Sequence, residues 1–322
     1  MSDRIAILDL GTNTFNIFIA EINKSPSLGE GKGMGSYTKL YKSKISVKLG
    51  EGGINKNHIE EKPFRRGINA LKKHKKTIKK FGAEKVFAFA TSAIRSATNG
   101  KDFVNAVKEK TGIDVKIITG DKEAELIYYG VRSAVKMNSK PSLIMDIGGG
   151  STEFILADKK EILWKQSFLL GAARLLEKFN PSDPINESEK KKIEIYLEEN
   201  LQPLFSAVKK FPAEELIGSS GSFDSLAEMI AHRFYNIEIV KGKTEYDFNL
   251  DDCEKMYNII LNSTTEERLH MKGLIKMRVD MIVISAIFVD YVFIRLGLKK
   301  MRLSKYSLKE GVLWELLNNH NS

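Results

Sequence analysis

The chain has 322 residues, of which 42% are hydrophobic and 29% charged, and this composition excludes a disordered, collagen-like or coiled-coil protein. Its length suits two domains, because single hydrophobic cores stop growing at roughly 250–300 residues. Its 51 Lys and Arg outnumber 41 Asp and Glu, so the net charge of +10 favours a polyanionic partner, and the single cysteine, Cys253, excludes a disulfide scaffold and favours the cytoplasm.

The first predicted elements alternate apolar residues with small turn formers, as hairpins do. In chain order they are a strand at 4–10, a turn at 11–14, a strand at 15–22, a Gly- and Lys-rich loop at 24–37, a strand at 45–49, an amphipathic helix at 62–81, a strand at 85–90, a helix at 101–110 and a strand at 115–119.

The second half opens in the same way, with strands at 143–147 and 154–156 around a glycine turn. After it we expect helices within 187–211, a strand-turn-helix unit at 215–232, helices at 251–262 and 278–296, and a final amphipathic helix at 308–317. The most apolar run, 281–289, is shorter than the ~20 residues of a membrane span, and the amino-terminal residues do not resemble a signal peptide. We therefore expect no membrane partner.

The two hairpins are related by an offset of 137 residues, which places Asp9 on Asp146, Gly11 on Gly148 and Thr14 on Ser151. This single repeat predicts an α/β fold of two similar domains that face each other across a cleft. We expect the first domain at 1–125, with a helix at 306–322 packing back on it, and the second at 126–305.

The second hairpin carries the sharpest functional signal, Asp146-Ile-Gly-Gly-Gly-Ser-Thr-Glu153. Free amides of Gly148, Gly149 and Gly150, with the hydroxyls of Ser151 and Thr152, are suited to cradle phosphate oxygens. A turn centred between Gly149 and Gly150 would set Asp146 opposite Glu153, and paired carboxylates beside phosphate favour Mg²⁺. The structural alternative is a Gly-rich hairpin with a solvated acidic pair.

The first hairpin repeats this pattern, but its turn has one glycine instead of three and is weaker evidence for a phosphate site. Asp9 and Asn16 are expected to oppose each other, and Thr12, Asn13 and Thr14 offer hydroxyl and amide donors to a second phosphate. An ordinary turn is the alternative.

Two charged residues are predicted beyond the hairpins, at places where a strand gives way to a helix. Arg95 follows the strand at 85–90, where open α/β sheets bind ligands, and a guanidinium there can grip phosphate. Glu123 follows the strand at 115–119 and begins a helix, which makes it either a helix-capping carboxylate or a general base.

Two further features are consistent with anion binding. The loop Gly218-Ser219-Ser220-Gly221-Ser222 precedes a helix, so it predicts either a phosphate site or a tight turn. Six lysines within 72–80 form one face of a helix and are more typical of a solvated surface than of a nucleic-acid site, because no aromatic platform or nucleic-acid motif accompanies them. We expect no nucleic-acid partner.

Six segments resemble, in the same order, the exopolyphosphatase/guanosine pentaphosphate phosphohydrolases of the Ppx/GppA family. They are DLGTNT at 9–14, LGEGG at 49–53, ATSAIRSATN at 90–99, GDKEAEL at 120–126, DIGGGSTE at 146–153 and GSSGS at 218–222. The resemblance implies duplicated actin-like, sugar-kinase-like ATPase domains with a ribonuclease H-like core. It also implies that the chain is the short, two-domain form of the family.

The resemblance further implies roles for individual residues. Glu123 would activate water, Arg95 would contact phosphate, and Glu153 would serve both the reaction and the metal, which Asp146 and Asp9 would also hold. The substrate would be inorganic polyphosphate or pppGpp, with Mg²⁺ as cofactor and K⁺ as an optional activator, and a homodimer is an option.

Some positions depart from the family pattern, which puts substrate choice and turnover in question. Glu125 replaces a usual Arg, Ser285 a usual Gly, and Ser304 to Gly311 carries Lys305, Tyr306 and Lys309 in a usual Ser-Asp-Gly…Arg-Glu-Gly segment. Our leading hypothesis is an exopolyphosphatase. The alternatives are a pppGpp phosphohydrolase, a non-catalytic binder of (p)ppGpp or polyphosphate, and an ATP-dependent kinase.

Overall fold

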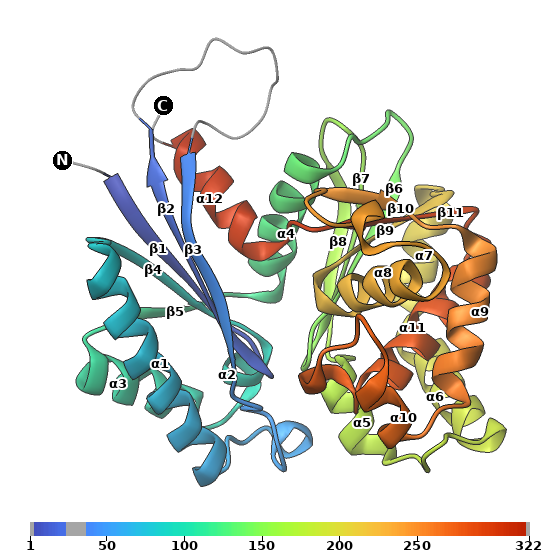
Figure 1. Ribbon diagram of the computed structural model, residues 1–322, viewed down its shortest axis with the longest axis horizontal. Coiled ribbons are helices and arrows are strands. Elements are labelled where there is room, and N and C mark those ends of the chain that lie inside the picture. Colours follow the sequence, from blue (N-terminus) through green and yellow to red (C-terminus); the bar gives the residue numbers. More distant parts are fainter. Residues whose placement is uncertain (1–2, 24–36, 320–322) are drawn as a thin grey trace. The chain divides into compact units, whose positions relative to one another are not determined.

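The computed structural model describes residues 3–23 and 37–319, and the chain separates into two compact units (Figure 1). Unit 1 comprises Met1–Ser133 and Leu308–Ser322, and unit 2 comprises Ala134–Ser307. The loop predicted at 24–37 lies almost entirely outside the described residues, as do the last three residues of the predicted carboxyl-terminal helix.

Unit 1 is built on a five-stranded sheet with the order β3-β2-β1-β4-β5. Its elements are β1 (Asp3–Leu10), β2 (Thr14–Ile22), β3 (Tyr37–Ser46), the 3-10 turn η1 (Ile54–Lys56), α1 (Glu61–Phe81), β4 (Lys85–Ala90), α2 (Ser92–Ser96), α3 (Gly100–Thr111), β5 (Val115–Ile117), α4 (Gly120–Ala134) and α12 (Leu308–Asn319).

Helix α1 forms for the reason that its sequence predicts: Ile68, Leu71 and Ile78 recur on one face and are buried. The helix packs on α3 so closely that a Cβ added at Gly67 would lie 2.7 Å from the Phe103 ring. The lysines at 72, 73, 75, 76, 79 and 80 all remain exposed on the opposite face.

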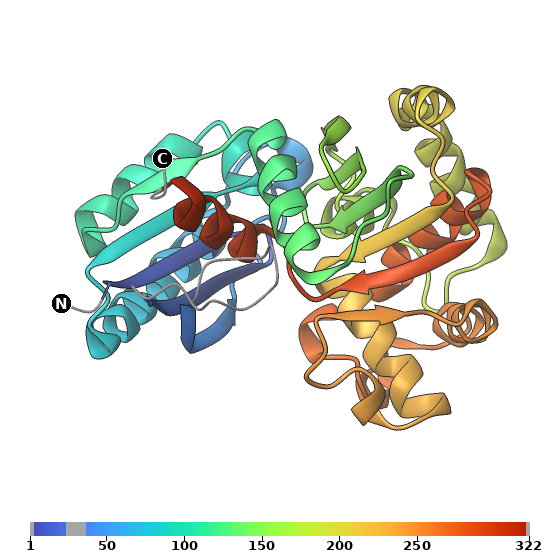
Figure 2. The same ribbon diagram turned by 90° about the horizontal axis from the view of Figure 1, so that it is seen from above.

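Unit 2 has a six-stranded sheet with the order β10-β11-β9-β6-β7-β8, whose neighbours can be followed in Figure 2. Its elements are β6 (Ser142–Ile147), β7 (Thr152–Ala157), β8 (Ile162–Phe168), α5 (Ala172–Phe179), α6 (Glu187–Asn200), α7 (Gln202–Lys210), β9 (Glu215–Ser219), α8 (Ser220–Phe234), η2 (Ile237–Ile239), β10 (Glu245–Asp247), α9 (Leu250–Leu261), α10 (Thr265–His270), η3 (Lys276–Arg278), α11 (Ile282–Arg295) and β11 (Lys300–Ser304).

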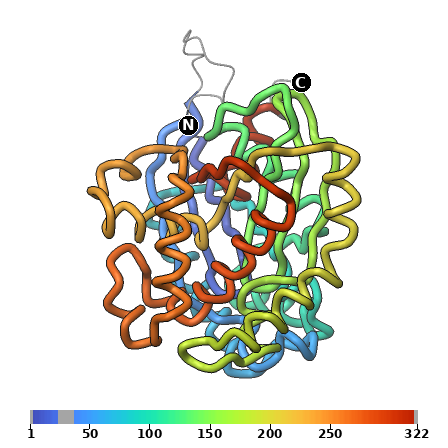
Figure 3. Tube along the Cα trace, turned by 90° about the vertical axis from the view of Figure 1, so that its right-hand side faces the viewer, coloured from blue at the N-terminus to red at the C-terminus, as the bar shows by residue number. Residues whose placement is uncertain are grey.

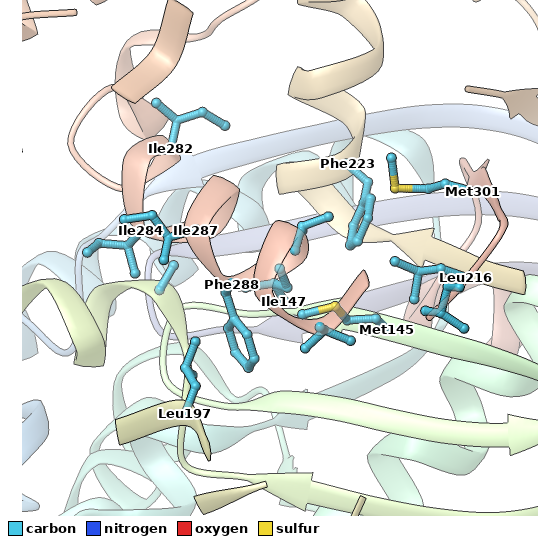
Figure 4. Packing of buried hydrophobic residues seen from close by; sticks show 14 of the residues in the cluster. Met145, Ile147, Leu197, Leu216, Phe223, Ile282, Ile284, Ile287, Phe288 and Met301 are labelled. Carbon is cyan, nitrogen blue, oxygen red and sulfur yellow. The ribbon is translucent and has the colours of Figure 1, made fainter. Parts of the chain in front are cut away.

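The core of unit 2 lies between this sheet and its helices. Phe288 of the apolar helix α11 and Met145 of β6 belong to the same buried cluster (Figure 4). Phe288 also packs edge-on against Phe154 of β7. This packing fixes the strand pair β6–β7, which carries the glycine turn. No helix in the described ranges is long and apolar enough to cross a membrane.

The internal repeat is confirmed by the strand pairing. In each unit the first strand pairs antiparallel with the second and parallel with a later strand, β1 with β2 and β4, and β6 with β7 and β9. The pairing of the second strand with the third shifts register between Ile19 and Ala20 in unit 1 and between Leu156 and Ala157 in unit 2. These positions are again 137 residues apart, so even the irregularity is duplicated.

Two predicted elements are wrong in their bounds. The strand expected at 45–49 is the end of β3, which stops at Ser46 because the amides of Val47, Lys48 and Leu49 turn to the carbonyls of Asn13 and Thr12. The helix expected at 278–296 begins only at Ile282. Arg278 instead ends the 3-10 turn η3, and its guanidinium donates to the Gly221 carbonyl.

Candidate functional site

The glycine hairpin of unit 2 places its two carboxylates as the sequence predicts. Asp146 of β6 pairs with Glu153 of β7, one step from the end of each strand, and their exposed fractions are 5% and 1%. Buried carboxylates require partners, since an unpaired buried charge is costly. Serine hydroxyl groups donate hydrogen bonds to both carboxylates.

Asp146 is held by three serines on one of its oxygens. Its Oδ2 accepts hydrogen bonds from Ser219 (2.6 Å), Ser220 (2.7 Å) and Ser307 (2.5 Å). Its other oxygen, Oδ1, accepts none from the described part of the chain. The three donors therefore fix the carboxylate and leave one oxygen for an exogenous group.

Glu153 has a similar arrangement on the neighbouring strands. Its Oε1 accepts hydrogen bonds from Ser151 (2.7 Å), at the end of the turn, and from Ser167 (2.6 Å), its register partner on β8. Ser151 thus supports a carboxylate in addition to offering a hydroxyl to the turn, and the hydroxyl of Thr152 donates to the Leu170 carbonyl.

The glycine turn has its carbonyls tied down and its amides open. The carbonyls of Gly148, Gly149 and Gly150 accept hydrogen bonds from the first residues of α5 and from Arg174 Nε. The amides of Gly149 and Gly150 donate to no acceptor among the described residues. A Cβ added at Gly171 would lie 2.4 Å from backbone atoms of Gly149 and Gly150, so the residue before α5 packs directly against the backbone of the turn. This polarity suits anion binding.

The loop from 218 to 222 serves the aspartate more than an open anion site. Ser220 has φ of 67°, the left-handed region that non-glycine residues avoid, and this conformation accompanies the hydrogen bond from its hydroxyl to Asp146. Ser222 donates to Ser285, so the serine found in place of the family's glycine has a defined partner.

Two cations lie in this region of unit 2. Arg278 donates to Ser225 Oγ, and burial lowers the pKa of its guanidinium against the opposing charges of Asp224, Glu228 and Asp146. Lys305 pairs with Asp224 (3.2 Å) and Glu228 (3.1 Å), and although burial opposes its charge, these carboxylates raise its pKa. The family departure at Lys305 is thus neutralised locally.

In unit 1, the first hairpin confirms the predicted opposition of Asp9 and Asn16. They pair in register, and Asn16 Nδ2 donates to Asp9 Oδ2 over 2.9 Å. The turn carbonyls of Thr12 and Asn13 accept the amides of the segment after β3, while Thr14 Oγ1 lies 3.4 Å from Asn16 Nδ2. The carbonyls of both hairpin turns are therefore occupied by backbone amides of a neighbouring segment.

The structure also brings together Arg95 and Glu123, 28 residues apart. Arg95 Nη1 donates to Glu123 Oε2 over 2.7 Å and to the Ile118 carbonyl over 3.2 Å, and Glu123 is 7% exposed. Glu125, on the same helix, contacts Lys122 at 3.1 Å, and Lys122 also bonds to Glu315 of α12. Glu125 thus has a cationic partner on its own helix, which it shares with Glu315.

Each unit thus gathers its own predicted residues, and their roles remain predictions. Unit 1 joins Arg95 to Glu123 and Asp9 to Asn16, and unit 2 joins Asp146 to the serine loop. Sequence reasoning missed Ser167, Ser307 and Arg174. Ser167 was detectable, because its place opposite Glu153 follows from one more antiparallel strand, whereas single serines and arginines give no signal of their own.

No group of three or more His, Cys, Asp or Glu side chains suited to a metal occurs among the described residues. The donor set still fits Mg²⁺, which takes hard oxygen ligands and usually keeps several waters or phosphate oxygens beside one or two carboxylates. The open Oδ1 of Asp146 is one such ligand.

Comparisons with known proteins agree with the motifs. A model described as the Ppx/GppA phosphatase family matches residues 30–320. The bifunctional 3-dehydroquinate synthase/phosphatase of Fusobacterium nucleatum is 32% identical over 321 residues, which cover 98% of this chain but only 46% of that protein. This chain thus spans about half the length of that relative.

Two crystal structures show the same fold. An exopolyphosphatase from Cytophaga hutchinsonii is 38% identical, with 98% of both chains covered and a TM-score of 0.90. A Ppx/GppA family member from Aquifex aeolicus is 25% identical, with 100% of both chains covered and a TM-score of 0.79. These matches confirm the predicted fold class, duplicated α/β domains, and the predicted enzyme class, a phosphohydrolase. The chain belongs to the Ppx/GppA phosphatase family.

Proposed function

We propose that the protein is an exopolyphosphatase, which removes the terminal phosphoryl group of inorganic polyphosphate as orthophosphate. The observation that carries the proposal is the glycine turn of unit 2, whose open Gly149 and Gly150 amides lie beside the fixed carboxylate of Asp146. A relative of this fold, from Cytophaga hutchinsonii, bears the name exopolyphosphatase. A cytoplasmic location belongs to the same proposal.

In this reaction unit 1 supplies the proton acceptor. Glu123 takes a proton from water, the water oxygen bonds to the terminal phosphorus, and the bridging P–O bond breaks with its electrons on the shortened chain. Arg95, already bonded to Glu123, offsets the charge on the phosphoryl oxygens. The amides of the glycine turn hold phosphate oxygens in unit 2.

Mg²⁺ is part of the proposal. Asp146 and Glu153, with Asp9, are the carboxylates that would hold it, and when bound it would supply positive charge to the phosphate oxygens. The hydroxyl groups of Ser219, Ser220 and Ser307 would orient the Asp146 carboxylate for that task.

The test is orthophosphate release from long polyphosphate, pppGpp and ATP, each with and without Mg²⁺. We expect rapid, Mg²⁺-dependent release from polyphosphate. Faster release from pppGpp would assign the alternative phosphohydrolase activity. No release from any substrate, with polyphosphate still bound, would identify a non-catalytic binder, and phosphate transfer from ATP to an added acceptor would indicate a kinase.

A further inference from the structure

Unit 2 contains a cavity of about 450 Å³ that the proposed reaction does not use. It is lined by α8, α9 and α11, with Met301 of β11, and its size falls within the roughly 300–1,000 Å³ of small-molecule sites. Figure 3 shows α9 and α11 on the same face of unit 2, and Figure 4 labels Phe223, Ile282 and Met301, three of the residues that line the cavity.

The wall of the cavity is mainly apolar, and it continues to the surface. Leu250 at the start of α9 and Ile294 near the end of α11 both line it, and they are 37% and 68% exposed. Because exposed apolar side chains that join an apolar cavity form one continuous surface, a hydrocarbon ligand can cover both at once.

Two polar groups in the wall give the cavity a chemical preference. The Tyr257 side chain lines the cavity, and its buried hydroxyl acts on the Asp290 carboxyl group and lowers the pKa of that group. Asp290 also lines the cavity, and burial raises the pKa of its carboxyl group. A ligand that donates hydrogen bonds can reach the Asp290 carboxyl group from the cavity.

The charged groups near Asp290 determine whether the cavity favours a cationic or an anionic ligand. Glu194 and Glu254 add negative potential at its carboxyl group, and Lys190 is the cation that acts on it. Lys190 is shared, because its Nζ also lies 3.8 Å from Glu187 and 3.9 Å from Glu194. The local balance is therefore acidic, although the whole chain carries +10.

We propose that this cavity is a binding site for an apolar amine, a molecule with a hydrocarbon body and one ammonium group. The ammonium group donates to the Asp290 carboxylate, and the hydrocarbon body packs between α9 and α11. The site lies behind the first turn of α8, since Ser222 lines it while Ser220 bonds to Asp146. The proposal is independent of the reaction proposed above.

The only cysteine of the chain provides a direct probe, because Cys253 lines the cavity. Burial raises the pKa of its thiol to about 12, so its reaction with N-ethylmaleimide at pH 8 should be slow and sensitive to cover. We expect micromolar dodecylamine to slow this labelling at least about 10-fold, with dodecanoate at the same concentration having little effect, as measured by intact-protein mass.

Two variants locate the ligand. Asp290→Asn keeps the shape of the wall and should weaken dodecylamine binding about 10-fold, so that the preference over dodecanoate disappears. Ala286→Trp should fill the cavity and abolish protection by either compound. Thermal unfolding checks that both variants are folded. If Ala286→Trp does not fold, the comparison of Asp290→Asn with the unaltered protein still tests the proposal.

The comparison of the two amphiphiles separates the site from general binding. A chain of net charge +10 attracts dodecanoate more than dodecylamine, so non-specific binding predicts the opposite preference. Equal protection by both compounds, protection by dodecanoate alone, no protection, or protection that persists in a folded Ala286→Trp variant would each overturn the proposal.

Discussion

Arg95 donates from Nη1 to Oε2 of Glu123 over 2.7 Å, so the predicted phosphate ligand and the predicted base form one ion pair within unit 1. The pair joins the first turn of α4 to α2, the short helix after β4. The ion pair orients the carboxylate of Glu123. A substitution of either residue therefore also removes a hydrogen-bond partner of the other.

Replacing Glu123 by Gln should lower kcat for phosphate release by about 10²–10⁴-fold, because the amide cannot accept a proton from water. Polyphosphate affinity should change little, since Arg95 loses only a partner. Glu125→Gln is the matched control: its partner Lys122 lies outside the pair, and its activity should stay near that of the unaltered enzyme. Full activity of Glu123→Gln would remove the base from the proposed function.

The left-handed backbone conformation of Ser220 favours glycine at this position, whereas the hydrogen bond to Asp146 requires a hydroxyl group. A non-glycine residue pays about 1–2 kcal/mol in the left-handed region, so Ser220→Gly should be more stable than Ser220→Ala by about 1 kcal/mol, as urea unfolding would measure. Ser222, two residues into α8, is the control, where Gly should be less stable than Ala by about the same amount. The same order at both positions would contradict the strain at Ser220.

His74 should make unit 1 sensitive to acid. Burial lowers the pKa of its ring below 6.5, and Nε2 lies 3.1 Å from the Phe15 carbonyl of β2. The unfolded chain therefore takes up a proton before the folded chain does, and stability present above pH 6.5 is lost as the pH falls below it. The slope can reach about 1.4 kcal/mol per pH unit for one proton.

His74→Gln should flatten this dependence between pH 7.5 and 5.5, whatever its effect on stability at pH 7.5. An unaltered slope in His74→Gln would mean that another group titrates.

The exposed lysines of α1 should matter for long substrates only. Replacing Lys72, Lys73, Lys76 and Lys79 by Gln should raise KM for long polyphosphate and flatten its salt dependence, because Coulomb attraction between exposed charges is screened by salt. KM for tripolyphosphate should change little. Gln at Lys209 and Lys210, exposed lysines of unit 2, is the control, and an equal effect per lysine replaced in both sets would indicate a general charge effect.

The hairpins could be predicted because glycine turns and apolar alternation are local signals. The repeat then added what one hairpin could not, since the offset that relates Asp9 to Asp146 also relates the two register shifts. The strands β8, β10 and β11 were missed. The alternating residues of β8 are only half-buried, and β11 is a five-residue strand whose pairing with β9 reaches back across 85 residues.

The hydroxyl partners of the carboxylates were beyond sequence reasoning for a different reason. Ser307 bonds to Asp146 across 161 residues of chain, and only the parallel placement of β11 beside β9 brings it there. Serine is too common for its position alone to indicate a partner. The resemblance to a family, by contrast, found Glu123 and Arg95, whose local sequence allowed a helix cap and a surface arginine as readily.

The chain enters unit 2 after Ser133 and returns to unit 1 at Leu308, where α12 packs on β1 and Glu310 bonds to Lys42 of β3 (Figure 1). Gly311 makes this return fit, because a Cβ there would lie 1.7 Å from the Leu126 carbonyl of α4. During synthesis, therefore, every residue of unit 2 leaves the ribosome before unit 1 receives its last helix. Synthesis of unit 1 therefore starts before that of unit 2 and ends after it. The surface of β1 that α12 covers stays exposed until α12 has been made.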